Sequence, residues 1–366
     1  MLTLLVVLGH ASQPFLGVDS SPNDPAWVRL LDHVSTALVA VRMPAFFVLA
    51  GMVIWRGINT DDVGAFVVKR AMRLGVPLAF VLLMINPVEM WLRLRHGELL
   101  GRSYVPPLGE ALIPGLLDGT AVLHLWFVRA LLYTTLLSPL LAGAVARLSR
   151  EAKIGLALVI LFVGSGAQLT SWHLDQSFAA AFGTEWMTPS RLLLAIRFVT
   201  IGMIISSDTE LLRWLFGRVR GSLSFVLVAA LVVFATTSSR SPAVVVLNTL
   251  AIAMLPIPCI VLLSAVFQRR STWRQHFAAL DSSGYTIYLL HHIIVVAGAV
   301  MLKNWVGNTF MAFALTFGIA LTVPLLLDLY VVRRFQMFAF LMNGVLTSSR
   351  RRGRSSEYGA LSLEPR

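Results

Sequence analysis

Long apolar segments recur along nearly the whole chain and alternate with short polar connections. About 20 consecutive apolar residues are enough for a helix to cross the ~30 Å hydrocarbon core of a bilayer. We therefore expect membrane-spanning helices near residues 2–16, 34–55, 74–92, 122–146, 154–171, 191–207, 222–238, 243–266, 281–300 and 309–330. The pattern predicts an all-α integral membrane protein, a polytopic bundle of about ten transmembrane helices.

The segments between these spans are too short to form a soluble domain, so residues 1–346 are expected to fold as one transmembrane domain. Residues 347–366 are rich in Ser, Arg and Gly, which predicts a disordered basic tail. The first apolar run has no basic flank and no clear cleavage site, so it does not read as a signal peptide. Because it begins directly at Met1, we expect the natural start to lie upstream.

The composition supports a membrane location, because 57% of the residues are hydrophobic and only 13% are charged. The net charge of +12 is distributed as a topology signal, which does not suggest a nucleic-acid partner. Lys and Arg are concentrated in alternate connections, at residues 56–73, 147–153, 213–220, 269–274 and 333–354. The positive-inside rule places these connections, and both termini, in the cytoplasm.

Several ionisable residues interrupt the apolar runs: His10, Arg42, His124, Arg129 and the pair His291–His292. An ionisable group in hydrocarbon costs a few kcal/mol or more, so each of these residues is a functional-site hypothesis. With the predicted topology, all of them lie in the outer half of the membrane or near its centre. The sequence therefore predicts a layer of histidines and arginines at one depth, although each histidine could alternatively serve only an interhelical hydrogen bond.

The types of residue in this layer favour direct group transfer. Histidine titrates near neutrality and can take a proton from a hydroxyl, while arginine can stabilise a developing oxyanion. No Gly-x-Ser-x-Gly motif marks a serine nucleophile, and the lone Cys259 has no obvious partner. A metal site at His124, His291 and His292 is not expected, because their spacing matches no metal-binding motif.

A second basic cluster lies on the predicted cytoplasmic side, where Lys69, Arg70 and Arg73 precede the third span. Arg70 and Arg73 are three residues apart and share one face if this segment is helical. Such a pair suits a phosphate or pyrophosphate group. The alternative is that these residues only anchor the helix at the membrane surface.

Five stretches together resemble the membrane acyltransferase 3 family, and within it the glucan biosynthesis protein C branch of periplasmic glucan succinyltransferases. The stretches are Leu4–His10, Arg42–Gly51 (Arg-Met-Pro-Ala-Phe-Phe-Val-Leu-Ala-Gly), Lys69–Pro77, His124–Phe127 (His-Leu-Trp-Phe) and Tyr285–His292, which ends in Tyr-Leu-Leu-His-His. Two departures stand out. The family's first-helix arginine would precede Met1, and Ala50 replaces a common serine.

The resemblance implies a bacterial inner-membrane enzyme without a permanently bound cofactor. An acetyl or succinyl group would pass from cytoplasmic acyl-CoA to a hydroxyl of an extracytoplasmic sugar, polysaccharide or glycolipid. His10 would be the base or a transient acyl carrier, and Arg42, His124 and His292 would line the acceptor side. Lys69, Arg70 and Arg73 would hold the donor. Two alternatives stay open: a transporter or exporter that uses the same residues as a proton or anion path, and a structural subunit.

Overall fold

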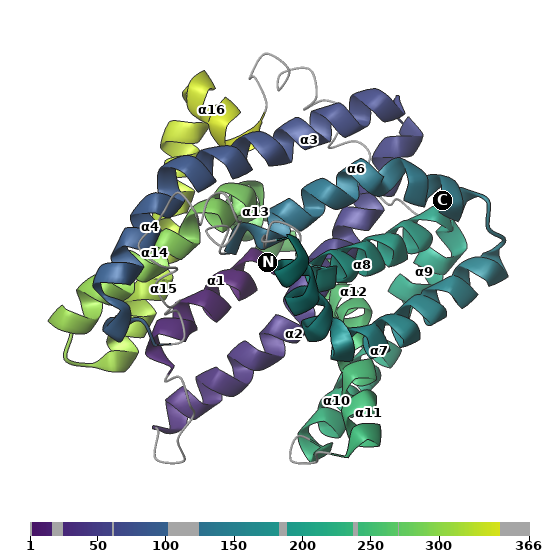
Figure 1. The fold of residues 1–366 in the computed structure, drawn as a ribbon, viewed down its shortest axis with the longest axis horizontal. Helices are drawn as coiled ribbons and strands as arrows, with labels where there is room; N and C mark the ends of the chain where they lie inside the picture. The colour runs from purple at the N-terminus through teal and green to yellow at the C-terminus, as the bar shows by residue number, and fades with distance from the viewer. Residues whose placement is uncertain are drawn as a thin grey trace.

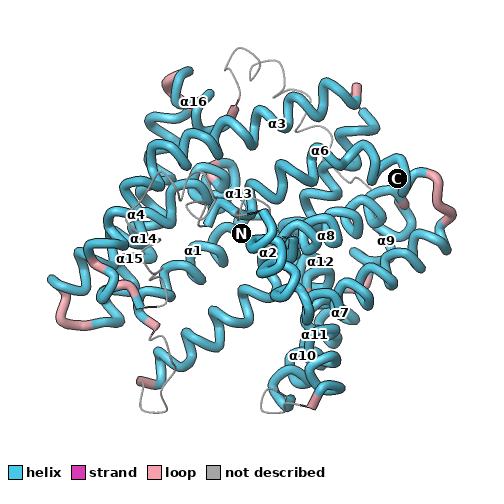
Figure 2. The backbone as a smooth tube through the Cα atoms, viewed as in Figure 1, coloured by secondary structure: helices cyan, strands magenta, loops and turns pink. Residues whose placement is uncertain are grey.

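The computed structural model describes residues 2–16, 25–60, 62–101, 124–182, 189–236, 241–269 and 271–344. Within these ranges nearly all residues are helical and none forms a β-strand (Figure 2). This confirms the prediction of an all-α protein. The basic tail at 347–366 and most of the long connection before His124 lie outside the described residues.

Fifteen α-helices make up the described fold. They are α1 (Leu2–Ser12), α2 (Ala26–Thr60), α3 (Val63–Phe80), α4 (Asn86–Arg95), α6 (Trp126–Ala146), α7 (Arg150–Phe182), α8 (Pro189–Ser207), α9 (Thr209–Gly217), α10 (Val219–Thr236), α11 (Pro242–Met254), α12 (Pro256–Arg269), α13 (Ser271–Ser282), α14 (Gly284–Trp305), α15 (Thr309–Leu327) and α16 (Gln336–Asn343). Two π-helices, Val81–Ile85 and Asp328–Val332, extend α3 and α15, and 3₁₀ turns occupy Gln13–Phe15 and Gly97–Leu99.

Seven helical segments in the described part of the chain are long and apolar enough to cross a membrane, or up to eight if the bent pair α9–α10 forms one span. The first predicted span corresponds to the short apolar α1, and the predicted span at 154–171 lies within the 33-residue α7. Neither is among the seven. A multi-pass membrane protein is therefore confirmed, while ten spans and cytoplasmic termini stay predictions.

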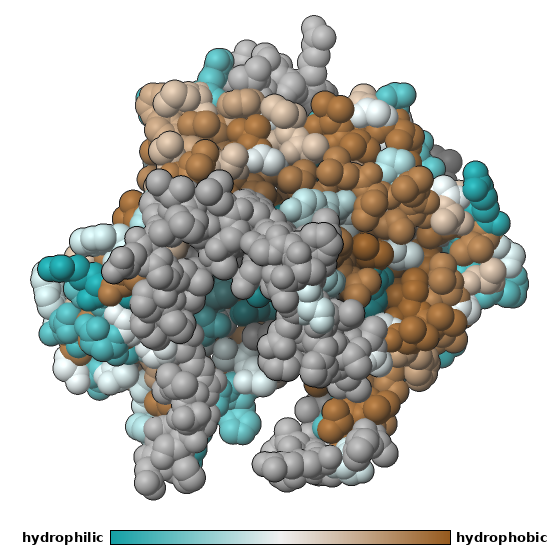
Figure 3. Space-filling view, in the orientation of Figure 1, coloured by the Kyte–Doolittle hydropathy of each residue, from teal (hydrophilic) through white to brown (hydrophobic). Residues whose placement is uncertain are grey.

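In Figure 1, α4, α14, α15 and α16 lie on the left, α7 to α12 lie on the right, and α2 lies between these two groups. α2 packs along α8, and α8 also contacts α6 and α7. α1 packs between α2, α14 and α15, whereas α10, α11 and α12 pack on one another. Apolar side chains cover a broad area of the surface at the top and right of Figure 3, over α3, α6 and α8, as expected for a protein that faces lipid.

Glycines bring α2 and α8 unusually close. A Cβ atom at Gly51 would overlap the backbone carbonyl of Val199, and one at Gly202 would overlap the carbonyl of Val48. Small residues at such crossings let two membrane helices pack backbone to backbone. This contact fixes α2, and with it Arg42, against the rest of the bundle.

A buried polar network fixes the beginning of α14. The Asp328 carboxylate, in the π-helix after α15, accepts hydrogen bonds from Ser283 Oγ at 2.8 Å and Thr286 Oγ1 at 2.7 Å. Arg333 neutralises the same carboxylate with an ion pair of 2.7 Å. Because π-helical turns re-aim the side chains that follow them, both π-helices contribute to the orientation of the helices that carry the site.

Candidate active site

Histidines from α1, α14 and the turn before α6 meet inside the bundle. The His10 ring centroid lies 5.2 Å from that of His291 and 4.9 Å from that of His292. His124 lies 5.4 Å from His291 and 4.4 Å from His292. His124, His291 and His292 are buried, while His10 is partly exposed. The fold thus gathers four imidazoles that come from three distant parts of the sequence.

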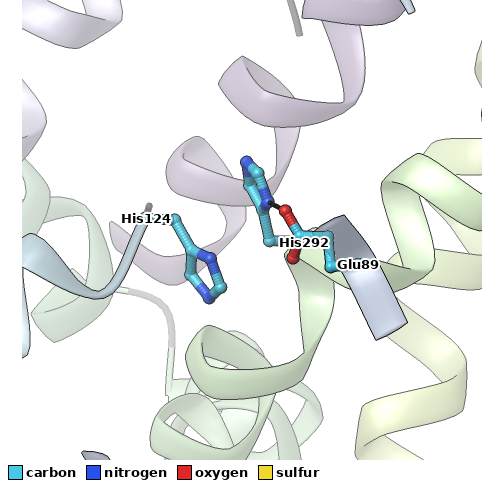
Figure 4. A group of neighbouring side chains, drawn as sticks. All are labelled: Glu89, His124 and His292. Atoms are coloured by element: carbon cyan, nitrogen blue, oxygen red, sulfur yellow. Dashed lines mark hydrogen bonds and ion pairs between the residues drawn. The ribbon is translucent and has the colours of Figure 1, made fainter. Parts of the chain in front are cut away.

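A carboxylate from α4 completes the cluster (Figure 4). Glu89 is fully buried and accepts a hydrogen bond of 2.6 Å from His292 Nδ1. Its other neighbour is Arg93, one helical turn further on, whose guanidinium donates to the same oxygen at 2.9 Å. A carboxylate in this position holds the imidazole in one tautomer and one orientation, and Arg93 Nη2 lies 3.5 Å from the second ring nitrogen, Nε2.

His124 is positioned by two contacts with α14. Its ring stacks on that of His292 with only 15° between the planes, and its Nε2 lies 3.3 Å from the carbonyl oxygen of Leu289. The Tyr288 hydroxyl donates to the backbone carbonyl of His124 at 2.5 Å. The residues before α6 are therefore fastened to α14 at the level of the histidine cluster.

His291 is oriented by its own helix. Its Nδ1 donates to the carbonyl oxygens of Tyr288 at 2.7 Å and Ile287 at 3.1 Å. This leaves Nε2 as the nitrogen with a free lone pair. His291 is fully buried between His10 and His124, so it is more central to the cluster than the sequence alone indicated.

Arg42 of α2 lies against the backbone of α1. Its Nη1 donates to the carbonyl oxygens of Leu5 and Val6, each at 3.4 Å, and the side chain is buried. A Cβ atom at Gly9 would overlap the Arg42 guanidinium. The glycine that precedes His10 therefore creates the space that Arg42 occupies.

Four polar atoms of the cluster have no hydrogen-bond partner within the described residues. They are His10 Nδ1, Glu89 Oε2, His124 Nδ1 and His291 Nε2, and all four are buried. Buried polar atoms in native structures are normally paired, so unpaired ones in a group suggest a place for a substrate or water. With neutral histidines, Arg42, Arg93 and Glu89 leave the group with one net positive charge, which favours an oxyanion.

The donor atoms of Glu89, His124 and His292 lie within 4.8 Å of one another, close enough to hold a metal ion. Two histidines and one glutamate are also a known zinc set. The ring arrangement fits a metal poorly, because the stacked rings of His124 and His292 lie side by side and do not converge on a common point. In addition, Glu89 already pairs with Arg93 and His292. The geometry fits a hydrogen-bonded relay better than a metal centre.

The basic residues of α3 lie near the beginning of α14. The Arg70 guanidinium is partly buried, 5.9 Å from the centre of the Phe66 ring, while Lys69 and Arg73 are exposed. The Tyr285 hydroxyl donates to the Arg73 carbonyl at 3.3 Å. His292 follows Tyr285 by seven residues, about 10 Å along the helix. The basic segment of α3 therefore meets α14 about two helical turns before the histidines.

The sequence predicted only a common depth for His10, Arg42, His124 and His292. The structure places these four residues close together and adds His291 to them. Arg129 is buried in the first turns of α6. Sequence reasoning missed Glu89 and Arg93. An acid at the end of the predicted third span was a usable signal, but the apolar count alone did not distinguish it from a residue at the membrane surface.

Residues 1–329 match the model of the acyltransferase domain family, acyltransferase 3. Because the match covers most of the chain, this protein belongs to that family. It is a multi-pass membrane acyltransferase, an enzyme that transfers acyl groups other than aminoacyl groups. No curated protein and no solved structure matches the chain.

Proposed function

We propose that this acyltransferase moves an acetyl or succinyl group from cytoplasmic acyl-CoA to a hydroxyl of an extracytoplasmic glycan or glycolipid, in a bacterial inner membrane. The observation that carries the proposal is a cluster of four histidines in which Glu89 is hydrogen-bonded to one of them, His292. The four are His10, His124, His291 and His292. The cluster offers a proton acceptor, a compensating carboxylate and a nearby cation in one water-poor site. The glucan-modifying branch resembled by the sequence supports the choice of acceptor.

On the donor side, Arg70 and Arg73 supply charge for the phosphates of coenzyme A. They are three positions apart on one face of α3, and the exposed Lys69 adds a third cation. Tyr285 joins this segment to the helix that carries His291 and His292. The pantetheine arm would then lead from the basic residues toward the histidines.

On the acceptor side, His10 takes the proton of the attacking hydroxyl. The hydroxyl oxygen forms a bond to the thioester carbonyl carbon, the carbon–sulfur bond breaks, and the coenzyme A thiolate leaves and takes the proton that His10 accepted, which returns His10 to its neutral form. Arg42 stabilises the negative charge that develops on the carbonyl oxygen. His10 suits the role of base because it is the only partly exposed histidine among the four in the cluster.

Glu89 and His292 support the proton transfer to His10. The carboxylate accepts a hydrogen bond from His292 Nδ1, and Arg93 Nη2 lies 3.5 Å from His292 Nε2, so both ring nitrogens of His292 are held in place. The ring centroids of His292 and His10 are 4.9 Å apart. At this distance the Glu89 carboxylate, through His292, can stabilise the positive charge that His10 gains with the proton. Glu89 is thus a positioning residue.

The test uses the full chain reconstituted in lipid, with radiolabelled acetyl-CoA or succinyl-CoA and membrane glycans as acceptors. We expect an O-acylated product, and His10→Ala should lower its rate by about 10²–10⁴-fold, the usual contribution of a general base. His33→Ala is the matched control, because His33 is exposed on α2 and bonded only to the Arg29 carbonyl among its described contacts.

An unchanged rate in His10→Ala would exclude His10 as the base. Mass spectrometry of the glycan distinguishes this enzyme from an exporter: the added mass identifies acetyl or succinyl. A glycan that crosses the membrane without added mass would contradict acyl transfer to it.

A further inference from the structure

Arg197 is a buried cation far from the histidine cluster in the sequence and unused by the proposed chemistry. It lies in α8, eight residues after Pro189 and ten before Ser207, near the middle of a membrane-spanning helix. Only 7% of the residue is exposed. An arginine at this depth costs several kcal/mol unless something compensates its charge.

Its described partners are all neutral. Nη2 donates to the Leu161 carbonyl at 2.9 Å and to Ser165 Oγ at 2.6 Å, both on α7, and the guanidinium lies 5.0 Å from the Phe198 ring centre. Nε is buried with no hydrogen-bond partner, and no carboxylate pairs with Arg197 in the described part of the chain. Among the described residues, the guanidinium charge of Arg197 therefore has no anionic partner and its Nε–H donor has no acceptor.

The same arginine lines a cavity of about 310 Å³ between α7 and α8. The other lining residues are apolar apart from Ser190 and Thr200. Val159, Val163 and Leu193 lie at its exposed edge, on the surface that faces lipid. The cavity is thus open to the bilayer and closed by a cation at its inner wall.

Gly164 is required for this arrangement. A Cβ atom there would lie 2.8 Å from both Cδ and Nε of Arg197 and would push the side chain away. The sequence therefore places a glycine where the arginine bends across α7, which keeps the guanidinium at the cavity wall.

A ligand for this cavity needs an apolar chain and one acidic group that can reach the middle of the membrane. A phospholipid phosphate is permanently charged and stays at the interface. A carboxylic acid can enter hydrocarbon in its neutral form and ionise where it meets a cation. From this charge complementarity we propose that the cavity binds a long-chain fatty acid, with its carboxylate paired to Arg197 and its chain along Val159, Val163 and Leu193.

The test measures saturable binding of radiolabelled palmitate to the full chain in phosphatidylcholine nanodiscs. Arg197→Gln should weaken binding by about tenfold or more, because it replaces a charge-assisted pair with a neutral hydrogen bond. Val163→Trp, which fills the mouth and leaves Arg197 in place, should weaken binding to a similar degree. Val228→Trp on the exposed face of α10 should not change it.

Two competitors define the ligand. Methyl palmitate, which lacks the acid, should compete poorly, and phosphatidylglycerol should not displace palmitate. Equal competition by phosphatidylglycerol would overturn the fatty-acid assignment. Equal palmitate affinity in Arg197→Gln, Val163→Trp and the unmodified protein would overturn the site itself. Neither result bears on acyl transfer at His10, because the assay contains no acyl-CoA.

Discussion

His10 and His292 are neighbours with different surroundings. His292 is buried and hydrogen-bonded to Glu89, whereas His10 is partly exposed and has an unpaired, buried Nδ1. An imidazole hydrogen-bonded to a carboxylate is held in one orientation, while a more exposed one can meet a substrate. We therefore assign the contact with the hydroxyl to His10 and the supporting role to the Glu89–His292 pair.

At the residue scale, Glu89→Gln should lower kcat by about 10–100-fold, the usual effect of removing a partner that orients a functional histidine. The amide keeps the size of the side chain but not its charge, so KM for acyl-CoA should stay nearly unchanged. Steady-state kinetics with varied acyl-CoA check this, because a positioning role affects kcat and not the ground-state binding of the donor.

An unchanged kcat in Glu89→Gln would contradict a positioning role for Glu89. A fall in kcat accompanied by a lower melting temperature would indicate a structural role instead. Glu89→Asp, which keeps the charge, serves as the conservative comparison.

Among the elements, the pairing of α2 with α8 matters most for the position of Arg42. The two helices approach through Gly51 and Gly202, each opposite a backbone carbonyl of the partner. Backbone carbonyls cannot rotate away as side chains can. Added atoms at these positions must therefore separate the helices.

Gly51→Ala should destabilise the protein by about 1–3 kcal/mol, the typical cost of overpacking, and should lower its melting temperature in detergent. Gly143→Ala is the matched control on α6, because a Cβ atom there meets nothing within 4 Å. That variant should be neutral or slightly stabilising, since alanine is the better helix former. Equal melting temperatures for the two variants would contradict the close crossing.

For the whole molecule, the proposed donor and acceptor regions lie about two helical turns apart and are joined by α14. Tyr285 contacts the basic segment of α3, and His291 and His292 follow two turns later on the same helix. The Asp328 network holds the start of this helix. Binding of the donor and chemistry at the acceptor are therefore expected to respond to different substitutions.

Arg70→Gln and Arg73→Gln should each raise KM for acyl-CoA several-fold with little change in kcat, because they remove charge from ground-state binding of the phosphates. Arg147→Gln, at the exposed end of α6, should leave KM unchanged. Initial-rate measurements with varied acyl-CoA check this. A fall in kcat at constant KM would place Arg70 and Arg73 outside the donor site.

The sequence by itself determined the class of fold and named half of the candidate site. Apolar runs longer than a bilayer is thick must form helices, because unpaired backbone groups cannot exist in hydrocarbon. The high energetic cost of charge in hydrocarbon marked His10, Arg42, His124, Arg129 and the pair His291–His292 as functional-site hypotheses. The five short stretches then indicated the acyltransferase family, which the family match over residues 1–329 confirms.

Only the tertiary structure decided which of these residues touch. Hydropathy fixes depth but carries no information on lateral neighbours, so the contact of Glu89 with His292, 203 positions apart, could not be read from the chain. The same holds for Arg197, which lies within a predicted span and was not singled out from the sequence. Only the packing of α7 against α8 places it beside Gly164 and a cavity. Side-chain partners across helices depend on rotation and crossing angle, and packing alone sets those.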